Sequence, residues 1–160
     1  MSDHKDDPTL HHRMSPRLPD YNYASKGAYF VTICLQEKQS HLEDPQLRTI
    51  LQHIWENLPQ RFPEVTLDEY IMMPDHIHFI LWLEPQGEKR SSLVDIVRVY
   101  KSLTARTAKS YLRSRGSIVG SPFWQRSFYD RVIRNEAELE QKRTYIRNNP
   151  VKDDLKHHRL

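Results

Sequence analysis

The sequence predicts an α+β fold, namely a ferredoxin-like βαββαβ domain with an antiparallel sheet and both helices on one face. Four runs rich in β-branched and aromatic residues are typical of strands, at residues 28–35, 65–73, 76–83 and 123–133. Two amphipathic segments lie between them, in the order strand, helix, strand, strand, helix, strand. The chain of 160 residues is most simply one domain with a substantial core.

The chain divides into an arm at residues 1–20, one domain at residues 21–155 and a tail at residues 156–160. The arm contains three prolines and no periodicity, so we expect it to be extended. Its Arg13 and Arg17 precede two tyrosines, a combination that suits phosphates and stacked bases. A tail that only solubilises the protein fits this composition equally well.

Composition excludes several classes of protein. No run of about 18 apolar residues is present, so we expect no contact with a membrane. The first residues are polar and acidic, unlike a signal peptide, and a cytoplasmic protein is expected. A single cysteine, Cys34, excludes an intramolecular disulfide and cysteine-only zinc sites, and we expect it in the core.

The first strand, residues 28–35, is apolar on both faces and is therefore expected at the centre of the sheet. Asp44 and Pro45 follow as an N-cap and a first-turn proline. Apolar residues then recur at helical spacing, and Pro59 is expected to end this helix.

The strand at residues 76–83 carries the clearest candidate site. Side chains alternate between the two faces of a strand, so His76 and His78 share one face with backbones about 7 Å apart. Both imidazoles can then reach one metal ion, although histidine pairs that ligate nothing are common. The opposite face, expected to pack against the helices, is formed by Ile77, Phe79, Leu81 and Leu83.

The next helix, residues 93–113, is expected to begin at a cap formed by Ser91 or Ser92. The stripe that it would bury consists of Leu93, Ile96, Tyr100, Leu103, Thr107 and Tyr111. The opposite, cationic side consists of Arg98, Lys101, Arg106, Lys109 and Arg113.

Basic charge is concentrated in the C-terminal half. Residues 98–147 hold 12 lysines and arginines against 4 acidic residues, whereas the whole chain has a net charge of only +3. This distribution favours a polyanion as a partner. Basic side chains that merely solvate a helix face are the alternative.

A last helix is expected from residue 136 to about residue 148, with Asn135 and Glu138 as a capping pair and Pro150 as its stop. Tyr145 and Asn149 are four residues apart and so share a helix face. An amide oxygen suits a hard divalent cation, and a phenol beside a metal ion is a credible covalent nucleophile. A partly buried aromatic residue at a helix end is the alternative for Tyr145.

The histidine segment MPDHIHFI, residues 73–80, resembles the HUH motif of single-tyrosine transposases that act on single-stranded DNA. The segments FWQRSFYDRVIR at residues 123–134 and YIRNNPV at residues 145–151 resemble the subgroup called REP-associated tyrosine transposases. So does the beginning of the domain, RLPDY at residues 17–21 through AYFVTI at residues 28–33. The order and spacing of these pieces make the resemblance quite specific.

The resemblance implies that His76 and His78 ligate Mg²⁺ or Mn²⁺ and that Tyr145 is the catalytic nucleophile. Asn149 stands where the family places its third ligand, a position often occupied by glutamine in the transposase branch. The implied enzyme is a DNA nickase and strand-transferase that acts through a 5′-phosphotyrosine linkage. Its implied location is the cytoplasm, in association with the nucleoid.

The implied partner is single-stranded or hairpin DNA, a REP-like palindrome with a short flank, bound by a monomer or a homodimer. A module that binds hairpins without turnover is the main alternative, and a protein that binds metal through terminal histidines is a weaker one. The residues expected to contact DNA are Arg13, Arg17, Arg98, Lys101, Arg106, Lys109, Trp124, Arg126, Arg131 and Arg143. Phe128 and Tyr129 are, with Trp124, candidates for base stacking if they are exposed, and several of these aromatic residues are expected in the core instead.

Overall fold

A computed structural model describes residues 21–23, 25–36, 40–85, 87–88, 91–120 and 122–157, and for residues 150–157 it describes the backbone alone. The four strands are β1 (Gly27–Cys34), β2 (Val65–Met72), β3 (His76–Leu83) and β4 (Tyr129–Ile133). They form one antiparallel sheet in the order β2-β3-β1-β4. The helices are η2 (His41–Glu43), α1 (Pro45–Glu56), α2 (Leu58–Arg61), α3 (Leu93–Ser114) and α4 (Glu136–His157).

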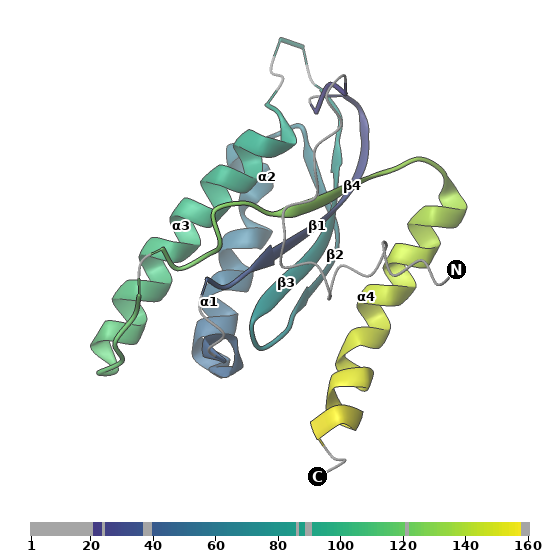
Figure 1. The fold of residues 1–160 in the computed structure, drawn as a ribbon. Coiled ribbons are helices and arrows are strands. Elements are labelled where there is room, and N and C mark those ends of the chain that lie inside the picture. The colour runs from purple at the N-terminus through teal and green to yellow at the C-terminus, as the bar shows by residue number, and fades with distance from the viewer. Residues whose placement is uncertain are drawn as a thin grey trace.

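The expected ferredoxin-like arrangement is confirmed. Helices α1, α2 and α3 cover one face of the sheet, and α4 lies across the other (Figure 1). Two apolar clusters follow from this layering. The larger one lies between the sheet and α1 and α3, and it contains the predicted inward face of β3, Ile77, Phe79, Leu81 and Leu83.

The local caps follow the sequence, with one exception. The carboxylate of Asp44 accepts from the backbone amides of Gln46 and Leu47, which begins α1 as predicted. The prediction that Pro59 ends this helix is wrong. Helix α1 ends at Glu56, and Pro59 lies in the first turn of α2, where its missing N–H costs no hydrogen bond.

Helix α3 begins at Ser92, whose capping box with Asp95 satisfies two amides of the first turn. The predicted set of buried residues on α3 is confirmed for the first two turns of the helix and wrong for the later turns. Leu103, Thr107 and Tyr111 are only partly buried, and the buried residues are their neighbours Thr104, Ala108 and Leu112. The buried hydroxyl of Thr104 is satisfied, because it donates to the carbonyl of Tyr100 and accepts from the indole of Trp124.

The last strand is shorter than predicted. Trp124 forms an isolated bridge with Leu35, but regular pairing begins only at Tyr129. Between them the ammonium of Lys101 donates to the carbonyls of Gln125 and Arg126, at 2.5 and 3.1 Å. Residues 123 and 125 also exchange backbone hydrogen bonds with Gln36 and Cys34 at the end of β1. The predicted strand is therefore interrupted between Gln125 and Tyr129.

Helix α4 continues to His157, so the prediction that Pro150 stops it is wrong. A proline fixes φ at a helical value, and its position removes one backbone hydrogen bond without preventing the helix from continuing. Leu139 and Ile146 bury the apolar side of α4 against the second cluster on the sheet. None of the helices among the described residues combines the length and apolar character that crossing a bilayer requires.

Replacing Phe79 tests the larger core, because this ring is fully buried and contacts the rings of Trp55, Tyr70 and Tyr100. Phe79→Ala is expected to lower the free energy of unfolding by about 3–5 kcal/mol, since it removes buried apolar area and leaves a cavity. Urea unfolding followed by circular dichroism measures the change. Ile118→Ala is the control, since Ile118 is 93% exposed, and its effect should stay within about 0.5 kcal/mol.

Candidate active site

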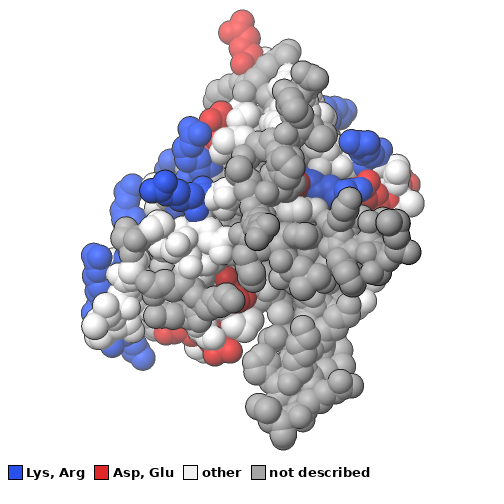
Figure 2. All heavy atoms as spheres, in the orientation of Figure 1, with Lys and Arg blue, Asp and Glu red and all other residues white. Residues whose placement is uncertain are grey.

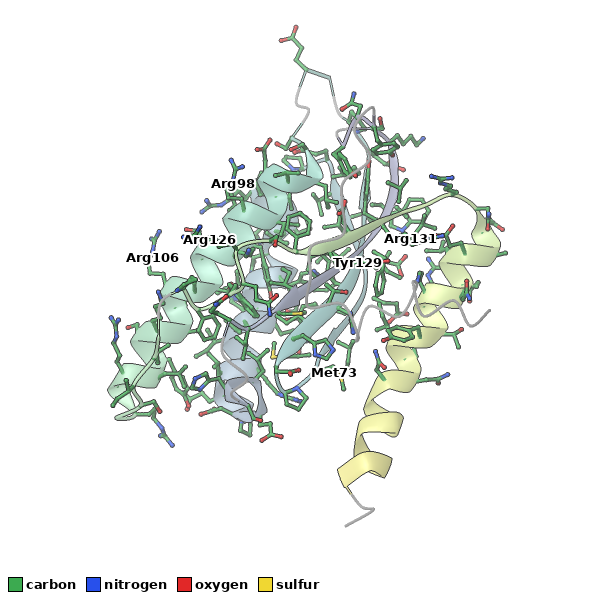
Figure 3. The ribbon with its side chains drawn as sticks, viewed as in Figure 1. Met73, Arg98, Arg106, Arg126, Tyr129 and Arg131 are labelled. Atoms are coloured by element: carbon green, nitrogen blue, oxygen red, sulfur yellow. The ribbon has the colours of Figure 1, made fainter. Side chains whose placement is uncertain are left out.

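His76 and His78 lie side by side at the start of β3. Their Nε2 atoms are 3.1 Å apart, and their rings are nearly perpendicular at 74°. The turn before them is fixed, because the amide of Met73 donates to the carbonyl of His76 at 2.8 Å. The amide of Leu35 also donates to the carbonyl of Asp75 at 2.9 Å, which ties the turn to the end of β1. Met73 marks this turn at the end of the sheet (Figure 3).

The other nitrogen of each ring has its own partner. His76 Nδ1 lies 2.7 Å from a carboxylate oxygen of Asp75. His78 Nδ1 lies 2.8 Å from the hydroxyl of Thr32, its cross-strand partner in the register of β1 and β3. A carboxylate can only accept, so Asp75 favours a proton on Nδ1 of His76, and Thr32 can accept in the same way. Protons on both Nδ1 atoms would leave the lone pairs of both Nε2 atoms free, as metal ligation requires.

His78 is completely buried. Burial lowers the pKa of its imidazole well below the usual value, and the nearby charges of His76 and Lys142 lower it further. The ring is therefore neutral at neutral pH, which is the form that ligates a metal. It also stacks on Phe30, with ring centroids 5.5 Å apart, so its orientation is set by packing as well as by Thr32.

Helix α4 brings Tyr145 to this pair. The centroid of its ring lies 5.5 Å from that of His78 and 6.2 Å from that of Phe30, edge-on to both. Tyr145 is half-buried. Lys142, one turn earlier on α4, is almost completely buried, and its ammonium lies 5.1 Å from the centroid of the Phe30 ring. The phenol and one cation of α4 thus occupy the same face of the sheet as the histidines.

Asn149 follows Tyr145 by one helical turn and is 6% exposed. It lies inside the helix, so the expectation that Pro150 would leave it at the helix end is wrong. Its side-chain nitrogen is buried without a hydrogen-bond partner among the described residues. A buried NH2 group without a partner costs free energy, and only a hydrogen-bond acceptor would remove that cost, whereas a cation would bind the amide oxygen instead.

These residues fit a divalent metal ion. Two ligands at right angles, each about 2.1 Å from an ion, are about 3.0 Å apart, close to the 3.1 Å that separates the two Nε2 atoms. His76 and His78 could therefore supply two imidazole donors to one ion. The described residues contain no group of three or more His, Cys, Asp or Glu side chains placed for a metal.

The cationic residues predicted to contact DNA fall into two groups, and Arg13 and Arg17 lie outside the described residues. In the first group each cation already has a protein partner. Arg131 is paired with Glu138 and Arg143 with Asp68 and Glu140, while Lys101 donates to two backbone carbonyls. Lys109 also has an interaction within the protein.

The second group consists of Arg98, Arg106 and Arg126, which are exposed. Arg98 has one weak contact at 3.9 Å to Asp95, and Arg106 and Arg126 have no carboxylate partner among the described residues. The three lie along α3, on the side of the molecule away from α4 (Figure 3). In the space-filling view, Lys and Arg gather along this same edge (Figure 2).

The aromatic residues expected to stack on bases belong to the core. Trp124 is 3% exposed and donates from its indole to Thr104 at 2.8 Å. Phe128 and Tyr129 are 7% and 9% exposed. None of these three rings offers a face to a base in this conformation, so the expectation of stacking is wrong for them.

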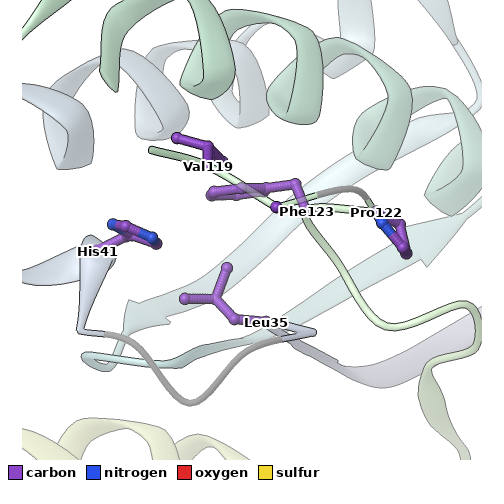
Figure 4. Close-up of a pocket in the computed structure, with 6 residues that line it drawn as sticks. Leu35, His41, Val119, Pro122 and Phe123 are labelled. Carbon is purple, nitrogen blue, oxygen red and sulfur yellow. The ribbon is translucent and has the colours of Figure 1, made fainter. Parts of the chain in front are cut away.

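Two hollows lie away from the histidines. One, with a volume of about 10 Å³, lies between His41, Val119 and Phe123 and has room for hardly one water molecule (Figure 4). The other, about 460 Å³, lies between α1, α2 and Leu103 of α3, on the helical side of the sheet. Neither is lined by His76, His78 or Tyr145.

Two residues that contact the site are not among those predicted from the sequence. Finding Thr32 requires the register of β1 against β3, which no local pattern reveals. Lys142 precedes Tyr145 by three residues, so helical spacing places it on the same side, and this signal was available.

Comparisons with known proteins identify the family of this chain. The family model described as "Transposase IS200 like" matches residues 23–149, and the chain therefore belongs to the IS200-like transposase family. Enzymes of this kind cleave DNA and transfer strands, and they generally use a divalent metal ion. The chain is thus a DNA-binding transposase by family, as its motifs predict.

Two relatives come from Haemophilus influenzae. An uncharacterised protein is 33% identical over 162 residues, which cover 89% of this chain and 90% of the relative. A protein that carries the name REP-associated tyrosine transposase is 27% identical, over 82% of this chain and 74% of the relative.

Two solved structures have a similar fold. A REP-associated tyrosine transposase bound to a REP hairpin superimposes with a TM-score of 0.63 and 26% identity, over 88% of this chain and 74% of the other. A protein of Deinococcus radiodurans described as a transposase gives a TM-score of 0.55 at 22% identity, over 84% and 97% of the two chains. The second likeness concerns the fold alone.

Thr32→Val tests the support of His78. Valine keeps the shape of threonine but leaves Nδ1 of a buried imidazole without its partner, so affinity for Mn²⁺ should fall about 10–100-fold. Titration calorimetry or the electron paramagnetic resonance of Mn²⁺ measures it. Thr49→Val on α1 is the control, because the Thr49 hydroxyl binds only the carbonyl of Pro45. Equal Mn²⁺ affinity in wild type and Thr32→Val would contradict the role of Thr32.

Proposed function

We propose that this transposase cleaves and rejoins single-stranded DNA next to a hairpin, with Tyr145 as the nucleophile. The observation that carries the proposal is the contact between the Tyr145 ring and the buried His78, whose ring nitrogen lies 3.1 Å from that of His76. The likeness to a structure that holds a REP hairpin supports hairpin DNA, a REP-like palindrome with a short flank, as the substrate.

The proposed reaction balances without a further reactant. The phenol oxygen of Tyr145 bonds to the phosphorus of the scissile phosphodiester and loses its proton, and the bond from phosphorus to the 3′ oxygen breaks. The 3′ oxygen takes up a proton and leaves as a hydroxyl, while the 5′ side stays on Tyr145 as a phosphotyrosine. A 3′ hydroxyl then attacks this linkage, which rejoins DNA and restores the phenol.

His76, His78 and Asn149 are the proposed holders of Mg²⁺ or Mn²⁺. When bound there, the ion polarises the phosphodiester and offsets the charge of the transition state. Asp75 and Thr32 hold the two rings in the ligating tautomer, and burial keeps His78 neutral. Tyr145 and Asn149 come from consecutive turns of α4, so docking this one helix delivers both the nucleophile and an amide.

Arg98 and Arg106 on α3, and Arg126 in the segment that precedes β4, are the proposed phosphate contacts. Arg98 and Arg106 are eight residues apart, a distance of about 12 Å along a helix. One strand of a duplex places a phosphate about every 3.4 Å along the axis. The distance between Arg98 and Arg106 therefore corresponds to roughly three to four phosphates. Such contacts would hold the DNA in register without reading its bases.

Formation of a covalent adduct tests the proposal. Purified protein, Mn²⁺ and a hairpin oligonucleotide with a single-stranded flank should give an adduct that survives denaturing electrophoresis. Tyr145→Phe should abolish it, because the ring remains but the attacking oxygen is gone. Tyr111→Phe, which removes a hydroxyl bonded to Asp44 on the helical side, is the control and should keep the adduct.

Other outcomes would contradict the proposal in different ways. An adduct that persists in Tyr145→Phe would assign the nucleophile to another residue. Tight binding with no adduct under any metal would favour the alternative, a hairpin-binding module without turnover.

A separate prediction concerns how DNA affinity depends on salt concentration. Replacing Arg98, Arg106 or Arg126 by glutamine should reduce the slope of log affinity against log salt by about 0.7–0.9 for each phosphate that the variant no longer neutralises. Fluorescence anisotropy over a salt series measures the slope. Arg61→Gln, an exposed residue of α2, is the matched control. Slopes identical to wild type in all three variants would place the DNA elsewhere.

A further inference from the structure

Two arginine–carboxylate pairs join α4 to the edge strand β2, and they flank Tyr145. Arg143 donates to Asp68 through two nitrogens, at 3.0 and 2.6 Å. Arg147 donates to Glu69 through two nitrogens, at 2.9 and 2.6 Å. One arginine lies two residues before Tyr145 and the other two residues after it. Because a planar guanidinium that donates twice fixes direction as well as distance, these pairs constrain how α4 is rotated.

Both carboxylates reach α4 because β2 contains a bulge. Leu67 and Tyr70 pair with residues 81 and 79 of β3, so two residues of β2, Asp68 and Glu69, lie opposite one of β3. In a regular strand these neighbours would point to opposite faces. Here Leu67 and Tyr70 both pack on the core side, while Asp68 and Glu69 both turn to the face that α4 covers.

Asp68 is itself firmly held. Its carboxylate also accepts from the indole of Trp82 at 2.9 Å, and its side chain is 10% exposed. Burial alone would raise the pKa of this carboxyl, but the hydrogen bonds from Arg143 and Trp82 outweigh burial and the net pKa is lowered. Asp68 is therefore charged at neutral pH and forms a rigid anchor for α4.

Apolar packing leaves the rotation of α4 loosely defined. Leu139 and Ile146 are the buried apolar residues that α4 contributes among its described side chains, and they are nearly two turns apart. Tyr145 also packs on the second apolar cluster, but so few apolar contacts fix the rotation of a 22-residue helix less firmly than directional hydrogen bonds do. A small roll of α4 would move Tyr145 and Asn149 together relative to the histidines.

We infer that the clamp, defined as the pairs Asp68–Arg143 and Glu69–Arg147, positions Tyr145 for attack. This inference rests on the proposed function, since it gives the clamp its role through Tyr145. It assigns Arg143 and Arg147 to positioning the helix rather than to binding DNA. The clamp residues act through Tyr145 and do not touch the reacting atoms.

Asp68→Asn tests the clamp with little change in shape, because asparagine still accepts from Trp82 while the charge opposite Arg143 is removed. The rate of adduct formation in a single turnover should fall about tenfold or more, as expected for a displaced nucleophile. The Kd for the hairpin oligonucleotide should change less than twofold. Glu69→Gln is a second, more exposed variant with a smaller effect expected in the same direction, and Arg143→Lys should retain part of the rate that Arg143→Gln removes.

The matched control is Glu140→Gln. Glu140 also accepts from Arg143, at 2.8 Å, but it lies on α4 itself and does not join the helix to the sheet. Its replacement should leave the adduct rate unchanged. Glu138→Gln, which breaks the pair with Arg131 near the start of α4, controls for a general loss of stability.

A spectroscopic measurement that needs no catalysis tests the clamp separately from the proposed function. With 3-fluorotyrosine at position 145, the chemical shift of the ¹⁹F resonance depends on the positions of the neighbouring His78 and Phe30 rings. Asp68→Asn should shift or broaden this resonance, whereas Glu140→Gln should leave it unchanged. An unmoved resonance together with a wild-type adduct rate in Asp68→Asn would overturn the clamp. A loss of DNA affinity as large as the loss of rate would overturn it too, since Arg143 would then be a DNA contact. If wild type forms no adduct, the proposed function fails, and the resonance still decides the clamp.

Discussion

The antiparallel pairing of β1 with β3 is the constraint on which the site depends. This register sets His78 opposite Thr32 and directs Phe79 into the core between the sheet and the helices. Because side chains alternate, a slip of one residue would turn both imidazoles into the core and expose the apolar set. The buried face of β3 therefore fixes the position of the histidines on the other face, so the energy that stabilises the fold also orients the site.

The open face of the sheet becomes a site only because α4 covers it. Burial under α4 removes His78 from water, which keeps the imidazole neutral and strengthens every electrostatic interaction near it. The same cover leaves the amide nitrogen of Asn149 without a partner among the described residues. A helix that packs mainly through polar and ionic contacts is well suited to this task, since a fully apolar interface would leave no room for charged substrate groups.

Local periodicity explains what could be predicted from the sequence. Alternation placed His76 and His78 on one face, and helical spacing placed Tyr145 and Asn149 on one side of a helix. The errors arose where tertiary contacts override local pattern. Lys101 binds the carbonyls of Gln125 and Arg126 where the predicted strand is interrupted, and the bulge at Asp68 depends on pairing with β3. Neither contact leaves a periodic signal, nor does the hydrogen bond from the buried Trp124 to Thr104.

The arginines show why a count of charge does not define an interface. Arg106 and Arg143 are indistinguishable in the sequence, since both lie on a helix within the basic half of the chain. In the fold, Arg143 is held by two carboxylates, whereas Arg106 has none among the described residues. A neutralised guanidinium must give up its partner before it can bind a phosphate, and an exposed one need not. The same residue type therefore stabilises the side of the sheet that α4 covers and leaves the α3 side available to a polyanion.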